Sequence, residues 1–408
     1  RITDQKTSVA LAGHHIICDG SSMAILVNEI ANRYNALTTR SDQPDASFAQ
    51  YVLEDSLSSK SKDNEHRNRE VGIDYWKDRL RDVPHDTRLA VPAPKTHHFE
   101  TSVDRHASSQ TCKATLSPNI VNLLHQRCRD WGVTPFEVIL TAWYSTLGRY
   151  AENEEIVLGV PVAGRDCSHL ESIVGCFINT LPIRLASPNG DSFQSRVAKV
   201  AETWRCDLRH ASVPLDSIIQ ELSIPRAMDR LPLIQHLVLH QPPVSKSIHF
   251  GDAQCTNFSS AYSTLGAYDT AIVCQWHSEP SSTSHDLKSQ LAVCDLTLAY
   301  SPTTIDSDTA EYLLEGFLIL LTAALREPAS IVSTLPIAGP KMQSFLTPIF
   351  ESERINRSQL TVLDLFVRRL KQTPDQVVVI DSAGSMTFDQ LDRQSTALAQ
   401  ALFRRGVT

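Results

Sequence analysis

The chain has 408 residues, of which 42% are hydrophobic, and a formal net charge of −8 at pH 7. This length and apolar content allow large cores and predict two to three domains. The mixed, net acidic charge excludes the basic surface that nucleic-acid-binding proteins carry. The nine cysteines are scattered and have no Cys-x-x-Cys spacing, so we expect reduced thiols in a cytoplasmic protein, with neither a disulfide framework nor a zinc site.

No segment predicts a contact with a membrane. The longest apolar run, residues 316–325, is too short to cross a bilayer, and no signal-peptide pattern occurs. The chain starts at Arg1 inside a strand-like pattern and stops at Thr408 just after a helical one. We therefore expect a fragment of a longer protein.

The first predicted elements surround two adjacent histidines. Residues 7–12 alternate in a way that predicts a strand. The segment that follows reads His14-His15-Ile16-Ile17-Cys18-Asp19-Gly20. Because neighbouring strand residues point to opposite faces, we do not expect the two histidines to serve the same site. Residues 21–37 then predict an amphipathic helix, with an apolar face made of Met23, Leu26, Ile30, Tyr34 and Leu37.

Three interpretations of the histidine segment compete. The first is a buried strand end with hydrogen-bonded histidines, in which Asp19 caps the following helix. The second is a metal site; it is disfavoured because no third ligand recurs at helical or hairpin spacing, and because Ile16, Ile17 and Cys18 are typical of packing. The third is a catalytic imidazole held by its own loop, with Asp19 turned away to fix that loop.

Helices further along the chain have recognisable ends. Residues 72–80 predict an amphipathic helix, and the proline-containing residues 82–98 predict an extended connection. A helix is expected from Ser117-Pro118 to Gly132, and a second one opens with a capping box at residues 134–137.

The C-terminal half continues this alternation of element types. We expect Asp308 to cap an apolar helix that ends before Pro328. A further helix is predicted at residues 191–209, and strands are predicted at residues 155–162, 177–185, 234–241, 269–276 and 291–300. Strands alternating with helices, without a short repeat, predict an α/β fold.

Several motifs resemble one known family. The segment His14 to Gly20 resembles the His-His-x-x-x-Asp-Gly signature of the condensation domains of nonribosomal peptide synthetases, which are relatives of chloramphenicol acetyltransferase. Residues 159–165 (Gly-Val-Pro-Val-Ala-Gly-Arg) and 174–184 (Val-Gly-Cys-Phe-Ile-Asn-Thr-Leu-Pro-Ile-Arg) resemble two further motifs of that family, in the expected order. The two histidines distinguish the chain from the heterocyclisation and terminal cyclising relatives of that family. The Gly-Cys-Phe-Ile-Asn-Thr string distinguishes it from the epimerisation relatives.

The resemblance implies an architecture. We expect a two-lobed α/β fold like that of chloramphenicol acetyltransferase, with an incomplete first lobe, followed by the start of an adenylation-domain α/β fold. Residues 1–90 are then part of the N-terminal lobe, residues 91–338 the C-terminal lobe, residues 339–358 a linker and residues 359–408 the N-terminal fragment of the adenylation domain. No glycine-rich phosphate loop occurs in this last segment, so we expect it not to bind ATP.

The resemblance also implies residue roles. It points to His15 as the catalytic residue, acting either as a proton acceptor or as a group that positions the amine and stabilises developing charge. It implies that Asp19 is structural and forms an ion pair with Arg165; Arg184 is the second choice of cation.

Four further residues have supporting roles in this interpretation. We expect His14 to pack and to form hydrogen bonds, and Gly20 to supply backbone freedom at the turn. Asn179 is a candidate polar residue of the site or of the strand that carries it, and Gln241 lies where some relatives place a polar residue of the substrate tunnel.

The implied activity is formation of an amide bond between a carrier-bound acyl or peptidyl thioester and a carrier-bound aminoacyl amine. The implied partners are donor and acceptor peptidyl carrier domains and the adjoining adenylation domain. The substrates are held by 4'-phosphopantetheine on the carriers, and we expect this chain to bind no cofactor or metal. We also expect it to be inactive alone, because missing strands leave a sheet edge unpaired.

Two alternatives stay open. One is a free-standing acyltransferase that uses soluble thioesters, and the other is a catalytically idle scaffold that docks carriers. The adenylation-like segment argues against the first, and the intact signature argues against the second.

Overall fold

The structure is a computed structural model, and it is described in two parts. The chain divides into two compact units, Arg1–Met342 and Gln343–Thr408, which we treat separately. The residues described are 7–35, 62–84, 87–91, 109–151, 155–165, 168–185, 190–226, 231–241, 248–255, 267–278, 291–350, 361–381 and 384–406.

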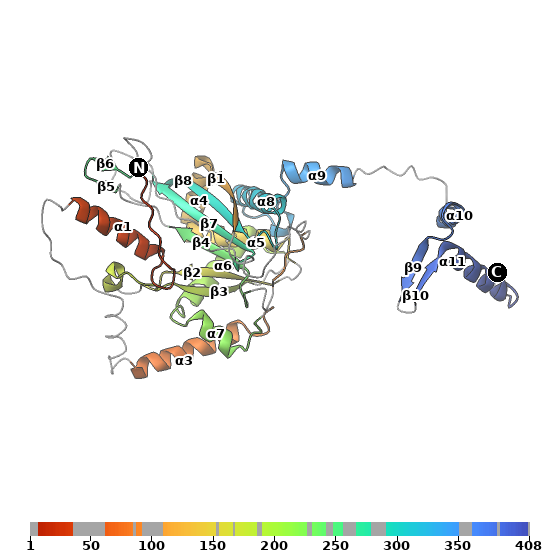
Figure 1. Cartoon of the computed structure of the whole chain (residues 1–408), viewed down its shortest axis with the longest axis horizontal. Helices are drawn as coiled ribbons and strands as arrows, with labels where there is room; N and C mark the ends of the chain where they lie inside the picture. The colour runs from red at the N-terminus through yellow and green to blue at the C-terminus, as the bar shows by residue number, and fades with distance from the viewer. Residues whose placement is uncertain are drawn as a thin grey trace. The chain divides into compact units, whose positions relative to one another are not determined.

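A six-stranded mixed sheet forms the centre of the first unit (Figure 1). Its strand order is β1-β8-β7-β4-β2-β3; β4 runs parallel to both β2 and β7, and the other neighbours are antiparallel. The sequence predicted five of these six strands, because their Val, Ile and Leu content suits strands buried on both faces. The strands are β1 (Gln110–Leu116), β2 (Ile156–Val162), β3 (Asn179–Leu185), β4 (His236–Gln241), β7 (Thr270–Ser278) and β8 (Leu291–Tyr300).

Four helices pack against one another and against this sheet. They are α4 (Pro118–Trp131), α5 (Pro135–Leu147), α6 (Phe193–Leu208) and α8 (Ser307–Arg326). Every residue of α5 from Glu137 to Leu147 is buried, and the hydroxyls of its buried Thr141 and Ser145 donate to backbone O atoms one turn earlier.

The helix ends follow local signals. Gly132 ends α4 with a left-handed backbone, φ 66°. Thr134 and Glu137 form both bonds of the predicted capping box. One predicted cap is wrong: Asp306, not Asp308, caps α8, and its side chain accepts a hydrogen bond from the Thr309 backbone N at 2.8 Å. Asp308 lies in the first turn, where a negative charge also favours the helix.

Helix α3 (Lys62–Arg79) joins the core of the sheet. Trp76 is 1% exposed, and its Nε1 donates to the backbone O of His210 at 3.1 Å. The Tyr75 hydroxyl donates to the buried Asp207 carboxylate at 2.5 Å, and α3 packs on α7 (Leu215–Glu221). The predicted domain boundary at residue 90 stays a prediction, and α3 shares its core with residues far beyond that boundary.

The N-terminal segment departs from the prediction. Residues 7–14 form no strand, and Val9 is 70% exposed. A strand needs a hydrogen-bonded neighbour, and none of the described residues pairs with this segment.

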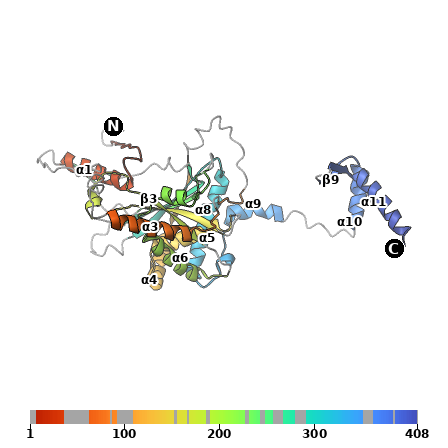
Figure 2. The ribbon, with the colours of Figure 1, turned by 90° about the horizontal axis from the view of Figure 1, so that it is seen from below.

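Helix α1 (Gly20–Asn35) forms as predicted, but its buried face differs. It buries Ser22, Val27 and Ala31, whereas Ile30 and Tyr34 are exposed. Figures 1 and 2 place α1 beside the segment that connects β2 to β3. Its C-terminal end contacts the small hairpin of β5 (His249–Phe250) and β6 (Ala253–Gln254), where the Asn35 Nδ2 donates to the His249 backbone O at 2.8 Å.

The remaining elements are short or belong to the second unit. In the first unit, 3-10 helices lie at η3 (Ser168–Ser172) and η6 (Val332–Thr334). Helix α9 (Pro340–Phe350) contains the boundary between the two units and falls within the predicted linker. The second unit has α10 (Val362–Gln372), an antiparallel pair of β9 (Val377–Asp381) and β10 (Gly384–Thr387), and α11 (Phe388–Phe403). Within the described residues, no helix combines the length and apolarity that a membrane crossing requires.

Candidate active site

The two histidines lie in a tight turn before α1. The Ile17 backbone N donates to the His14 backbone O at 3.0 Å, and the Ile16 backbone N donates to the His14 Nδ1 at 3.2 Å. The His14 ring is therefore engaged by its own turn. Ile16 and Ile17, which the sequence pattern predicted as packing residues, are 74% and 63% exposed; only Cys18 of the three is buried.

Asp19 caps α1 and also holds a second segment. Its Oδ1 accepts from the Ser22 backbone N at 2.8 Å, which satisfies a free donor of the first helical turn. Its Oδ2 accepts from the Phe177 backbone N at 3.2 Å. Asp19 thus both caps the helix, as the first interpretation of this segment expected, and fixes the loop, as the third expected.

Arg165 connects the two segments from the other side. Its Nη2 donates to the two carboxylate oxygens of Asp19 at 3.1 and 3.3 Å, and both side chains are almost fully buried. Its Nη1 donates to the backbone O of Ile173 at 2.7 Å, and its guanidinium lies 4.5 Å from the centre of the Phe177 ring. These are the two side chains predicted to pair.

Gly164 allows the close approach that places Arg165. Its backbone is left-handed, φ 60°, and a Cβ there would collide with the backbone O of Phe177. Glycine is the residue that adopts this conformation without a steric penalty. The two motifs at residues 159–165 and 174–184 are therefore held together at this point.

Ser22 is a site residue that was not predicted from the sequence. It is fully buried, its Oγ accepts from the Gly175 backbone N at 3.0 Å, and the same Oγ lies 2.7 Å from the Gly175 backbone O. A cap at Asp19 predicts a hydrogen bond from the Ser22 backbone N, but no signal in the sequence predicts the contact of its hydroxyl with Gly175.

The electrostatics of Asp19 fit a permanent anion. Burial alone would raise the pKa of its carboxyl, but hydrogen bonds from Ser22, Phe177 and Arg165 more than offset this and hold the pKa below its usual value. Asp19 therefore anchors the loop as a carboxylate and does not exchange protons near neutral pH.

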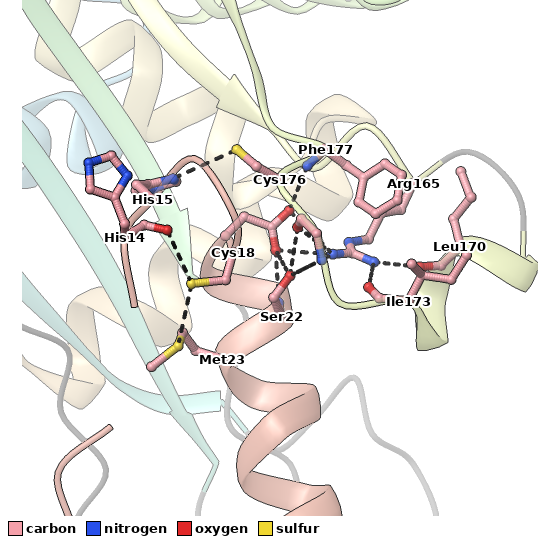
Figure 3. Close-up of polar contacts among 12 residues, drawn as sticks. His14, His15, Cys18, Ser22, Met23, Arg165, Leu170, Ile173, Cys176 and Phe177 are labelled. Atoms are coloured by element: carbon pink, nitrogen blue, oxygen red, sulfur yellow. Dashed lines mark hydrogen bonds and ion pairs between the residues drawn. The ribbon is translucent and has the colours of Figure 1, made fainter. Parts of the chain in front are cut away.

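Both histidines are exposed, so the packing expected of His14 is not seen, and His15 is the one whose ring meets the segment between β2 and β3. Its Nδ1 lies 3.8 Å from the Sγ of Cys176 (Figure 3). Asp19, Arg165 and Ser22 fix the backbone on both sides of this contact, whereas the His15 ring itself stays open to solvent. Among the residues that the structure describes, no three His, Cys, Asp or Glu side chains gather in a way that could hold a metal ion.

The other predicted site residues lie elsewhere or serve the fold. Asn179 donates to the backbone O atoms of Ala211 and Val213, both at 2.8 Å, and so fixes the turn before α7. Arg184, the second-choice partner of Asp19, pairs with Glu155 at 2.5 Å instead.

Two further predicted residues have different outcomes. Gln241 ends β4 opposite Gln275 of β7, and its place in a substrate tunnel stays a prediction. The role expected of Gly20 is wrong: it is the first residue of α1, its φ is not left-handed, and an added Cβ would meet none of the described atoms within 4 Å.

Comparisons with known proteins agree with this geometry. The sequence profile of the family described as "Condensation domain" matches residues 1–347. Gramicidin S synthase 2 of Brevibacillus brevis is 25% identical over 401 residues, which are 97% of this chain and 8% of that protein. PF 1022-synthetase of Rosellinia sp. is 25% identical over 417 residues, which are 100% of this chain and 12% of that protein.

Solved structures share the fold. The X-domain from teicoplanin biosynthesis, in complex with OxyB, has a TM-score of 0.65 and 20% identity, over 80% of this chain and 69% of that one. A four-domain nonribosomal peptide synthetase bound to AMP and glycine has a TM-score of 0.64 and 17% identity, over 97% of this chain and 29% of that one. The chain spans only a small part of the curated relatives it matches, and it belongs to the condensation-domain family of the nonribosomal peptide synthetases.

Proposed function

We propose that this domain joins two carrier-bound substrates through an amide bond. The amine of one carrier-bound aminoacyl group attacks the carbonyl carbon of the acyl or peptidyl thioester on a second carrier. The new C–N bond forms, the C–S bond breaks, and the amine loses one proton while the departing sulfur gains one. The thiols of both carriers are those of 4'-phosphopantetheine arms, so the chain itself needs to hold no cofactor.

The observation that supports this proposal is an exposed imidazole on a fixed loop. His15 is open to solvent, while Asp19 and Ser22, which follow it in the chain, tie its loop to Arg165 and Gly175 in the segment between β2 and β3. A free α-amino group titrates near about pH 8, so part of it is already neutral and nucleophilic at neutral pH. A positioned imidazole can then accelerate the reaction by accepting a proton or by stabilising charge.

We propose further that the chain is one section of a longer, cytoplasmic synthetase. In this proposal, strands that precede residue 1 complete the first lobe, and residues 359–408 open an adenylation domain. The match of 97% of the chain to one part of a four-domain synthetase supports this order. Carrier domains and an adenylation domain are then its partners, and the chain alone is inactive.

The test replaces His15 by alanine in the chain expressed with its flanking gene segments. Two carriers are loaded, one with an acyl or peptidyl group and one with an amino acid, and mass spectrometry follows transfer to the amino acid. We expect His15→Ala to lower the rate by about 10²–10⁴-fold, the range for a positioned acid–base group. His14→Ala is the matched control, and a smaller loss is expected because its ring serves its own turn.

Each alternative has its own outcome. Equal rates for His15→Ala and the unsubstituted protein would refute the catalytic role. Efficient use of soluble thioesters without carriers would indicate a free-standing acyltransferase. Docking of loaded carriers without any amide product would indicate a scaffold.

A further inference from the structure

The thiol of Cys176 lies against His15 in a place that the surrounding contacts determine. Its Sγ is 3.8 Å from the His15 Nδ1. The residue before it, Gly175, is held by the Ser22 hydroxyl, and the residue after it, Phe177, donates its backbone N to Asp19. The contacts that fix the histidine loop therefore also aim this side chain (Figure 3).

The chemistry of the thiol and the imidazole bears on which of them donates the hydrogen bond. Burial raises the pKa of the Cys176 thiol, and the negative charge of Asp19 acts in the same direction. A protonated thiol has an S–H to donate, and its neutral sulfur is a weak acceptor. With the thiol protonated, we assign the S–H as the donor to Nδ1. A neutral imidazole that accepts at Nδ1 carries its own proton on Nε2.

We propose that Cys176 is a positioning residue that holds the His15 ring through Nδ1 and presents an Nε2–H group to the reacting atoms. This inference rests on the proposed function of His15, and it chooses between the two roles considered for that residue. An Nε2 that already carries a proton cannot accept another from the amine. It donates a hydrogen bond to the oxygen of the thioester carbonyl as negative charge develops there, and the amine proton passes to the departing sulfur.

The kinetic test uses matched cysteine substitutions in the chain expressed with its flanking gene segments. Cys176→Ala removes the donor, and we expect kcat for amide formation to fall about three- to tenfold, as for loss of one hydrogen bond, with KM for the loaded carriers unchanged. Cys176→Ser keeps a donor and should lose less than Cys176→Ala. Cys206→Ala on α6 removes the same thiol away from the histidine loop and serves as the control.

The His15→Ala background separates this inference from the proposed function. If Cys176 acts through His15, Cys176→Ala has no further effect once the imidazole is gone. The same fold-loss in both backgrounds, or a Cys176→Ala enzyme as fast as Cys206→Ala, would overturn the positioning role and leave His15 catalytic. A fully active His15→Ala enzyme would instead overturn the proposed function.

A spectroscopic measurement covers the case in which no activity can be assayed. In the chain labelled with 15N-histidine, long-range 1H–15N correlations show which ring nitrogen carries the proton, and His15→Ala identifies the signals of His15. We expect a bare Nδ1 and a protonated Nε2, with the Nδ1 signal shifted by Cys176→Ala and not by Cys206→Ala. A neutral ring protonated on Nδ1, or no shift in Cys176→Ala, would contradict the inference.

Discussion

The layer of α4, α5 and α8 is fixed by apolar packing, whereas the loop that carries His15 is fixed by polar contacts. Trp143 of α5 is fully buried against Phe317 of α8, with ring centroids 5.7 Å apart. The histidine loop exposes its two isoleucines and depends on the Asp19–Arg165 ion pair. The difference teaches that the scaffold and the position of His15 can be disturbed separately.

The largest effect is expected from the apolar layer. Replacing Trp143 by alanine should lower the free energy of unfolding by about 3–5 kcal/mol, because it leaves a large cavity in a fully buried region. Denaturant unfolding followed by circular dichroism measures this. Trp143→Phe is the matched control and should cost much less, since it keeps a ring and removes an indole N–H that has no hydrogen-bond partner among the described residues. Equal losses for both variants would show that the cavity is not the cause.

The second effect should be confined to the polar contacts. Arg165→Ala leaves the buried Asp19 carboxylate without its cation, a change that costs about 3–5 kcal/mol when the pair is fully buried. We expect faster amide hydrogen exchange in residues 16–35 and a loss of amide formation, with protection of α5 unchanged. Asp19→Asn should have a smaller effect, because an amide oxygen still caps α1.

Arg184→Ala is the control for that experiment. Arg184 pairs with Glu155 and also donates to the backbone O atoms of Arg79 and Arg81, so the expected cost is about 1–3 kcal/mol, but exchange in α1 should not change. Unchanged exchange and activity in both Arg165→Ala and Asp19→Asn would remove any role for the ion pair.

The smallest expected effect is a change in the free energy of unfolding with pH, which has opposite signs for two aspartates. The pKa of Asp19 is lowered in the fold, so its contribution to stability is present above the unfolded value of about 3.9 and is lost as the pH falls. Burial raises the pKa of Asp207 despite its contacts with Tyr75 and Arg79. The contribution of Asp207 is therefore present at low pH and is lost as the pH rises through its folded value.

Unfolding curves between pH 3 and 7 test these signs. Asp19→Asn should flatten the acid loss of stability, and Asp207→Asn should flatten the loss toward neutral pH. The same direction of change in both variants would contradict this assignment.

The sequence predicted well those features that depend on local signals. Gly132 and the Thr134–Glu137 box end and begin their helices through contacts with neighbours in the chain, and the strands rich in Val, Ile and Leu could be recognised from their own composition. The pairing of Asp19 with Arg165 was expected only through the family resemblance. The tertiary contacts of Ser22 and Cys176 could not be predicted, because they depend on a partner about 150 residues away in the chain.

The errors have the same origin. The alternation of residues 7–12 suits a strand, but no described neighbour pairs with it, and the buried face of α1 is determined by the segment it meets and not by its most apolar side chains. The need for glycine at position 164 could not be predicted either, because only the fold shows that the Phe177 backbone leaves no room for a Cβ.

The anchoring of α3 has a practical consequence for recombining synthetases. Three α3 side chains contact residues beyond position 90: Trp76 contacts His210, Tyr75 contacts Asp207, and Arg79 contacts Asp207 and the backbone of Arg184. An exchange of residues 1–90 between relatives would therefore place α3 against contact residues from a different parent. A crossover placed within residues 36–61, ahead of α3, keeps these partners on one parental sequence. Chimaeras joined there should express in soluble form more often than those joined at residue 90.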